Sequence, residues 1–161
     1  MTISEGTTLP DATLLRMGAD GPEPVSLATR LRGRRVVLFG LPGAFTSTCT
    51  SAHVPSFIRT AAKFADKGVD EIICVSVNDP HVMTAWSDAT GAAAAGITFL
   101  ADADASFTTD IGMEFTAAAA GFFNRSKRYA LFAEDGVVKV FHPETGRGCE
   151  ISGGEAMLAA I

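Results

Sequence analysis

Two continuous apolar runs, with one long helical pattern between them, constrain the fold of this chain more than any other feature. The runs are RRVVLFGL at residues 34–41 and EIICVSV at residues 71–77. Unbroken apolar runs of this length are typical of strands that are buried on both faces of a sheet. Between the two runs, apolar residues recur at helical spacing over residues 48–65. The order therefore predicts a strand–helix–strand unit at the centre of the fold.

Breaker residues define the limits of this unit. Pro42 and Gly43 follow the first run and predict its end, and Gly68 is suited to close the helix. Pro55 stands inside the helical pattern, where a proline removes a backbone donor and clashes with the preceding turn. We therefore expect the helix to end or kink within its first turn and a half.

The remaining segments complete an α/β fold. We expect a helix at 80–89, a short strand at 98–101, a helix at 107–113, strands at 128–132 and 137–141 joined by a turn at 134–136, and a closing helix at 153–161. No element is assigned to residues 114–123. A strand–helix–strand half followed by a strand–strand–helix half (βαβ + ββα) is the thioredoxin arrangement. A strand at 11–17, turn-forming residues at 18–24 and a helical turn at 26–31 add an N-terminal β-hairpin extension.

Composition and charge exclude several classes of function. The chain has 161 residues, the length of one domain, so we expect a single domain over residues 1–161. A net charge of −5 argues against binding to nucleic acid. No apolar run reaches the ~20 residues of a membrane span, and residues 1–11 lack the features of a signal peptide. We therefore expect a cytoplasmic protein that contacts no membrane.

The three cysteines, Cys49, Cys74 and Cys149, do not form a disulfide or metal-binding pattern. An odd number of cysteines in a chain without a signal peptide argues against a structural disulfide framework. The sequence contains no CxxC pair and no His/Cys cluster with zinc spacing. The cysteines are therefore expected to be buried or reactive thiols.

Cys49 closes the most informative segment, PGAFTSTC at residues 42–49. The segment lies after a buried strand, at the edge where open α/β sheets bind their ligands. Cys49 then falls in the first turn of a helix, where unpaired N–H groups and the helix dipole favour a thiolate. Because the thiolate is the nucleophilic form of cysteine, this position predicts reactivity. The alternative is a buried cysteine that only begins a helix.

Thr46 replaces the first cysteine of a thiol–disulfide motif, three residues before Cys49. A hydroxyl forms no disulfide, but it can donate a hydrogen bond to sulfur or accept one from a substrate O–H. This pattern indicates attack on a small protic electrophile and argues against disulfide exchange.

Three segments, in order, resemble those of the type II, or peroxiredoxin 5-like, peroxiredoxins. They are PGAFTSTCTSAHVPSF at residues 42–57, EIICVSVNDPHVMTAW at 71–86 and NRSKRYALF at 124–132. The resemblance covers nearly the whole chain. It implies a thioredoxin fold and a thiol-dependent peroxidase that reduces hydrogen peroxide and alkyl hydroperoxides.

The resemblance also implies roles for four residues. Cys49 matches the peroxidatic cysteine, which attacks the terminal peroxide oxygen and becomes a sulfenic acid. Thr46 matches the threonine that orients the peroxide, and Pro42 matches the proline that shields the site from water. Arg128 matches the arginine that contacts the thiolate and the peroxide. A rigid guanidinium suits this position because its fork can contact two atoms at once.

Other residues near these motifs receive weaker interpretations. His53, one helical turn after Cys49, is expected to make structural hydrogen bonds. Phe45 and Phe123 are candidates for an apolar collar around the site, with core packing as the equal alternative. Four further residues are expected at the surface: His81, Arg125, Lys127 and His142.

The route by which the sulfenic acid is reduced stays open between three possibilities. The resemblance favours glutathione as reducing co-substrate together with glutaredoxin, and no other cofactor is expected. In the second route Cys149, set among glycines, resolves the sulfenic acid as an internal disulfide that thioredoxin reduces. In the third, Cys74 takes that part, although a sulfur in a buried strand should not reach Cys49 without local unfolding.

Type II relatives often form homodimers, and here Phe45 and residues 80–86 are the candidate contact. Trp86, the only tryptophan, would report on the site or the interface if it lies near either. The competing functions are a redox sensor that uses the same cysteine, a thioredoxin-like disulfide reductase and a structural protein with an inactive site.

Overall fold

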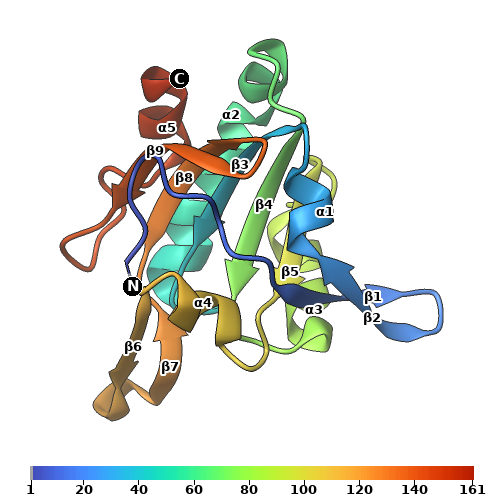
Figure 1. Ribbon diagram of the computed structural model, residues 1–161. Coiled ribbons are helices and arrows are strands. Elements are labelled where there is room, and N and C mark those ends of the chain that lie inside the picture. Colours follow the sequence, from blue (N-terminus) through green and yellow to red (C-terminus); the bar gives the residue numbers. More distant parts are fainter. Residues whose placement is uncertain (1) are drawn as a thin grey trace.

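The computed structural model describes residues 2–161, and its centre is a seven-stranded mixed sheet (Figure 1). In spatial order the strands are β2 (Gly21–Ser26), β1 (Thr13–Gly18), β5 (Ile97–Ala101), β4 (Glu71–Ser76), β3 (Arg35–Gly40), β8 (Tyr129–Glu134) and β9 (Val137–Pro143). Strand β4 pairs in parallel with β3 and β5, whereas β8 pairs antiparallel with β3 and β9. The two apolar runs of the sequence are thus neighbouring central strands.

Helices cover both faces of the sheet and divide the core into two clusters. On one face lie α2 (Val54–Asp66), α3 (Pro80–Thr90) and α5 (Gly154–Ala160), which contribute Phe57, Trp86 and Met157 to the first cluster. On the other face lie α1 (Leu27–Leu31) and α4 (Ser106–Asp110), which contribute Leu27 and Phe107 to the second. The βαβ + ββα order is confirmed, because β3–α2–β4 is followed by β8–β9–α5.

Helix α5 lies beside α2, and both can be followed on one side of the sheet in Figure 1. The contact is close because Gly154, the first residue of α5, carries no side chain. A Cβ at that position would collide with the carbonyl of Ser56 in α2. The backbone N–H of Gly154 instead donates to Ser56 Oγ at 2.9 Å.

The helix after β3 begins at residue 47 and is interrupted, as expected, by Pro55. Residues Cys49–His53 form a π-helical segment, η1, in which the Val54 N–H donates to the Cys49 carbonyl five residues earlier. Pro55 has no N–H for the usual bond to residue 51, so the wider turn replaces a regular one. A proline is thus the cause of an unusual backbone at Cys49.

Two expectations differ from the structure, and one segment without an assigned element forms a small sheet. Residues 21–24 belong to β2 and not to a turn; β2 is an edge strand, where prolines are tolerated because their missing N–H faces solvent. Helix α4 ends at Asp110 and is shorter than the helix expected at 107–113. Residues 114–126 form a second, two-stranded sheet, β6 (Glu114–Ala117) and β7 (Phe122–Ser126), with a 3-10 turn, η2 (Ala118–Ala120), between them. Within residues 2–161, no helix has the length and apolar character that crossing a membrane requires.

Candidate active site

Cys49 lies in the first turn of the helix after β3 and is fully buried, with 0% of its surface exposed. The first N–H groups of a helix have no partner within the helix, so positive partial charge faces this position. Arg128 Nη2 donates to Cys49 Sγ at 3.4 Å. A dipole and a guanidinium therefore both favour negative charge on this sulfur.

Arg128 comes directly before β8 and is itself buried, with 6% exposed. Its Nη1 lies 3.0 Å from His53 Nδ1, while Nη2 contacts Cys49. Its backbone carbonyl accepts from the Glu144 N–H at 2.9 Å. A buried guanidinium with these contacts has its fork fixed, so it does not need to reorganise when charge develops nearby.

His53 is held as a neutral imidazole of one tautomer. Because Arg128 only donates, His53 Nδ1 must accept, and the proton therefore resides on Nε2. Nε2 in turn donates to the Ser152 carbonyl at 2.9 Å. Burial, and secondarily the charge of Arg128, lowers the pKa of His53 from 6.5 to about 3, against the opposing effect of the Ser152 carbonyl. His53 is thus a neutral link between the arginine and residue 152.

The loop between β3 and the helix is fixed by polar contacts from other segments. The Thr46 hydroxyl donates to the Gly43 carbonyl at 2.7 Å, which leaves its lone pairs available to accept from a ligand. Asn78 Oδ1 accepts from the Ala44 N–H at 3.0 Å and from Ser76 Oγ at 2.6 Å. No pattern in the sequence indicates this role of Asn78, because its contact with the loop depends on the tertiary fold.

Arg125 also holds this loop, so the expectation that it is only a surface charge is wrong. Its Nη1 donates to the Pro42 carbonyl at 3.1 Å, and its guanidinium carbon lies 5.6 Å from the centre of the Phe122 ring. The half-buried position follows from the β6–β7 hairpin, which the sequence did not reveal. Lys127 is exposed, as expected.

A pocket of about 550 Å³ lies next to the residues that surround Cys49, although Cys49 itself does not line it. Pro42, Thr46 and Arg128 line it on the side of Cys49. Its apolar wall comes from the hairpin: Phe115, Ala117, Ala119, Ala120 and Phe122. Lys127 and Arg147 add two cations to the lining. The arrangement brings a small ligand up to the Thr46 hydroxyl and the Arg128 guanidinium, and Arg128 in turn contacts the buried Cys49 sulfur.

The expected collar residues do not line this pocket. Phe45 is 56% exposed and Phe123 is 61% exposed, so the alternative of core packing is wrong for both. Phe45 also has a positive φ of 63°, which turns the loop at this point. The aromatic residues that do face the pocket are Phe115 and Phe122, which no periodicity in the sequence distinguished.

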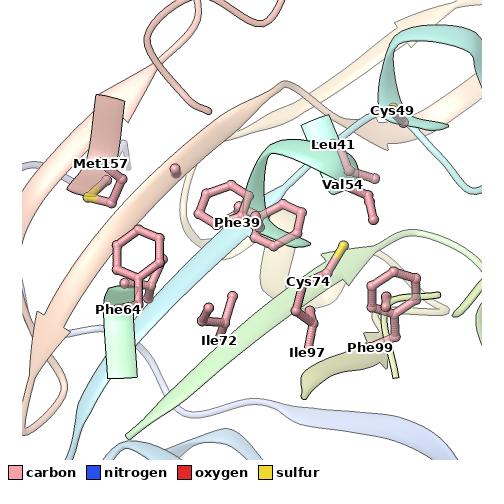
Figure 2. Close-up of a cluster of buried hydrophobic side chains, with 14 of the residues drawn as sticks. Phe39, Leu41, Cys49, Val54, Phe64, Ile72, Cys74, Ile97, Phe99 and Met157 are labelled. Carbon is pink, nitrogen blue, oxygen red and sulfur yellow. The ribbon is translucent and has the colours of Figure 1, made fainter. Parts of the chain in front are cut away.

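Cys74 lies within the apolar cluster between the sheet and α2 and is fully buried (Figure 2). Leu41 and Val54 lie between it and Cys49 in this view. Burial, with a smaller contribution from Cys49, raises the pKa of Cys74 well above its usual value, against the opposing charge of Arg128. A thiol in this environment is a poor nucleophile.

Cys149 is half-buried and lies next to Ser152, the residue whose carbonyl contacts His53. Its Sγ is 3.8 Å from Ser152 Oγ, and the Ser152 carbonyl is the partner of His53. Burial raises the pKa of the Cys149 thiol, and Ser152 and Arg128 oppose that effect. Cys149 is therefore near the site but separated from Cys49 by Ser152, His53 and Arg128.

The other singled-out residues are placed as follows. Trp86 is buried, and its indole N–H donates to Thr50 Oγ1 at 3.1 Å, next to Cys49 in sequence. His81 is exposed as expected, whereas His142 is half-buried and its Nδ1 has no partner among the described residues. Within residues 2–161, no three His, Cys, Asp or Glu side chains gather in a way that could hold a metal ion.

Comparison with known proteins decides the family. The model of the Redoxin family matches residues 4–158. Peroxiredoxin-2E-2, a chloroplastic protein of Oryza sativa subsp. japonica, is 45% identical over 164 residues, which cover 99% of this chain and 73% of that protein. The chain belongs to the type II peroxiredoxins.

Solved structures of other peroxiredoxins have the same fold. Reduced Prx3 from Vibrio vulnificus in complex with hydrogen peroxide is 43% identical, with a TM-score of 0.93 over 99% of each chain. Peroxiredoxin 5 from Alvinella pompejana is 30% identical, with a TM-score of 0.85 over 98% of this peroxiredoxin and 97% of that chain. Membership makes this peroxiredoxin a thiol peroxidase, an oxidoreductase that acts on peroxide.

Proposed function

We propose that Cys49 is the peroxidatic residue and that Thr46, Arg128 and Pro42 form the site at which it reacts. The contact of 3.4 Å between Arg128 Nη2 and Cys49 Sγ carries this proposal, because it places a fixed positive charge on the nucleophile. The thiolate attacks the terminal peroxide oxygen, so an S–O bond forms as the O–O bond breaks. Sulfur is oxidised to a sulfenic acid, and the leaving oxygen takes a proton to become water or an alcohol.

The polar groups around the pocket suit this displacement. The Thr46 hydroxyl, which donates to Gly43, accepts a hydrogen bond from the peroxide O–H and orients it. Arg128 contacts both sulfur and peroxide oxygen as negative charge moves from one to the other. Pro42 covers the site and limits entry of water. The structure of the Vibrio vulnificus relative in complex with hydrogen peroxide supports hydrogen peroxide as a substrate.

Glutathione with glutaredoxin is the proposed reductant. One glutathione thiol condenses with the sulfenic acid to give a mixed disulfide and water, and a second thiol releases Cys49 as oxidised glutathione forms. Two observations support an external thiol: Cys74 is enclosed in the core, and the pKa of Cys149 is raised by burial. Lys127 and Arg147 in the pocket lining also suit the two carboxylates of glutathione.

The alternative is a thioredoxin-dependent cycle in which Cys149 resolves the sulfenic acid. Its half-buried position, two contacts away from His53, favours Cys149 over Cys74 for that part. The internal disulfide would require the loop that carries Cys149 to move toward Cys49, and Gly146 and Gly148 give that loop freedom.

Steady-state peroxide consumption by four variants tests the proposal. The wild type, Cys49→Ser, Cys74→Ser and Cys149→Ser are supplied with glutathione and glutaredoxin, or with thioredoxin and its reductase. We expect loss of activity only in Cys49→Ser, with glutathione and glutaredoxin as the effective donor. Dependence on Cys149 with thioredoxin would establish the alternative. Oxidation of Cys49 without turnover in either system would indicate a redox sensor.

We further propose that the protein is a cytoplasmic homodimer that binds neither nucleic acid nor membrane and needs no cofactor besides glutathione. The exposed ring of Phe45, in the loop next to the site, supports a contact between two copies there. The negative net charge of −5 supports the absence of nucleic-acid binding.

A further inference from the structure

Glu144 gathers four hydrogen bonds on one carboxylate oxygen. Its Oε2 accepts from the backbone N–H groups of Glu150, Ile151 and Ser152, each at 2.8 Å, and from Ser152 Oγ at 2.7 Å. Its own backbone N–H donates to the Arg128 carbonyl at 2.9 Å. Glu144 thus connects the strand end that carries Arg128 to the loop at residues 145–152.

The same loop is connected to the Cys49 sulfur through two side chains, those of His53 and Arg128. The Ser152 carbonyl accepts from His53 Nε2 at 2.9 Å, and His53 Nδ1 accepts from Arg128 at 3.0 Å. Arg128 Nη2 then donates to Cys49 Sγ at 3.4 Å. A series of contacts therefore runs from the Glu144 carboxylate through the Ser152 backbone, His53 and Arg128 to Cys49.

An ionised carboxylate is the group best suited to this place. Hydrogen bonds to a charged acceptor are about twice as strong as those to a neutral one. Here the donors all belong to a loop that forms no helix or strand, so these bonds replace the regular ones that the loop lacks. Burial alone would raise the pKa of Glu144, but the bonds from the Ser152 side chain and from the N–H groups of residues 152, 151 and 150 lower it below its usual value. The loop has two glycines and, within residues 2–161, no other carboxylate bonded to its backbone, so Glu144 fixes the Ser152 carbonyl.

We propose that Glu144 is a positioning residue for the oxidation of Cys49. It holds the Ser152 carbonyl in place, that carbonyl orients the neutral His53, and His53 holds the Arg128 guanidinium against the sulfur. Among the described residues, Glu144 makes no hydrogen bond to the Cys49 sulfur, so it acts on that sulfur through Ser152, His53 and Arg128. By fixing the loop it also keeps Cys149 beside Ser152. The inference rests on the proposed reaction of Cys49 and is independent of the reductant.

Single-turnover oxidation of the reduced protein by hydrogen peroxide, without reductant, tests this inference. Trp86, whose indole contacts Thr50, provides a fluorescence signal next to Cys49. Since small displacements in a catalytic constellation cost one to two orders of magnitude in rate, we expect Glu144→Ala to lower the rate constant about tenfold. Glu144→Gln, which keeps an acceptor oxygen, should fall between Ala and the wild type. The pH at which the oxidation rate is half-maximal should be lowest in the wild type, higher in Glu144→Gln and highest in Glu144→Ala, because the guanidinium beside the thiolate is no longer fixed.

Two controls separate positioning from general disruption. Glu150→Ala removes an equal charge from the same loop but leaves its backbone N–H on Glu144, and should react within twofold of the wild type. In a His53→Ala background, which interrupts the series, the effect of Glu144→Ala should shrink to less than twofold.

Each outcome bears on a different claim. A wild-type Cys49 that does not react with peroxide would refute the proposed function, and this inference with it. A reactive wild type together with a folded Glu144→Ala variant of unchanged rate and pH profile would refute the positioning role alone. An undiminished effect of Glu144→Ala in the His53→Ala background would equally contradict it. If Glu144→Ala does not fold, Glu144→Gln decides: an unchanged rate refutes the role, and a reduced rate with a shifted pH profile supports it.

Discussion

Arg128 shares its two terminal nitrogens between His53 and the Cys49 sulfur, at 3.0 and 3.4 Å. A lysine offers a single nitrogen on a flexible stem and cannot keep both contacts. Because loss of one fixed donor to a developing charge costs about 10²–10³ in rate, Arg128→Lys should slow Cys49 oxidation by about that factor. Stopped-flow oxidation of the reduced protein measures this, with Lys139→Ala, at an exposed position of β9, as the control. A rate for Arg128→Lys within threefold of the wild type would show that the fork geometry is unimportant.

The buried, neutral His53 makes the stability of the protein depend on pH. Its pKa is lowered from 6.5 to about 3, so the unfolded state binds a proton first as the pH falls. The contribution of neutral His53 is complete above pH 6.5 and decreases progressively toward pH 3. At pH 5 the loss should be about 2 kcal/mol, from a difference of roughly 1.5 pH units at 1.36 kcal/mol each.

Urea unfolding at pH 7 and pH 5 measures this loss. His53→Gln should remove most of the difference between the two pH values, while His81→Gln, at an exposed site, should retain it. An equal loss in the wild type and His53→Gln would mean that other groups cause the acid sensitivity.

At the scale of the element, the π-helical segment Cys49–His53 carries both partners of Arg128. Its first residue supplies the sulfur and its last residue supplies the imidazole that contact the guanidinium. Since Pro55 prevents a regular turn, Pro55→Ala allows an ordinary α-helix and a changed register at Cys49. We expect a slower oxidation of Cys49, by about tenfold, without a loss of stability. Single-turnover kinetics and thermal unfolding measure the two effects. Pro22→Ala, on the exposed edge strand β2, is the matched control, and an unchanged rate in Pro55→Ala would contradict the argument.

Elements with a clear hydrophobic pattern, whether a continuous run or a helical period, were predictable from the sequence, and elements without such a pattern were not. The runs at 34–41 and 71–77 identified β3 and β4, because strands buried on both faces need continuous apolar sequence. The β6–β7 hairpin was missed because alanine residues 117–120 have no period and little strand preference. The sequence singled out Cys49, Thr46, Pro42 and Arg128 as candidates, three of them in one short motif. It did not single out Glu144, whose partners lie in an irregular loop without a sequence pattern, or Asn78, whose partner Ala44 is far away in the sequence.

At the scale of the whole molecule, the exposed Phe45 makes the proposed homodimer testable. Phe45 is 56% exposed in a loop next to the site that is held at a positive φ, so its ring is available to contact a second copy. If it anchors the contact between two copies, Phe45→Glu should raise the dissociation constant of the dimer by at least about 100-fold, because buried aromatic anchors dominate such interfaces. Sedimentation velocity over a range of concentrations measures this for the reduced protein. Phe123→Glu changes an equally exposed ring on the hairpin and should leave the dimer intact. A wild type that stays monomeric at every concentration would refute the homodimer. A Phe45→Glu variant that still dimerises would show that the contact lies elsewhere.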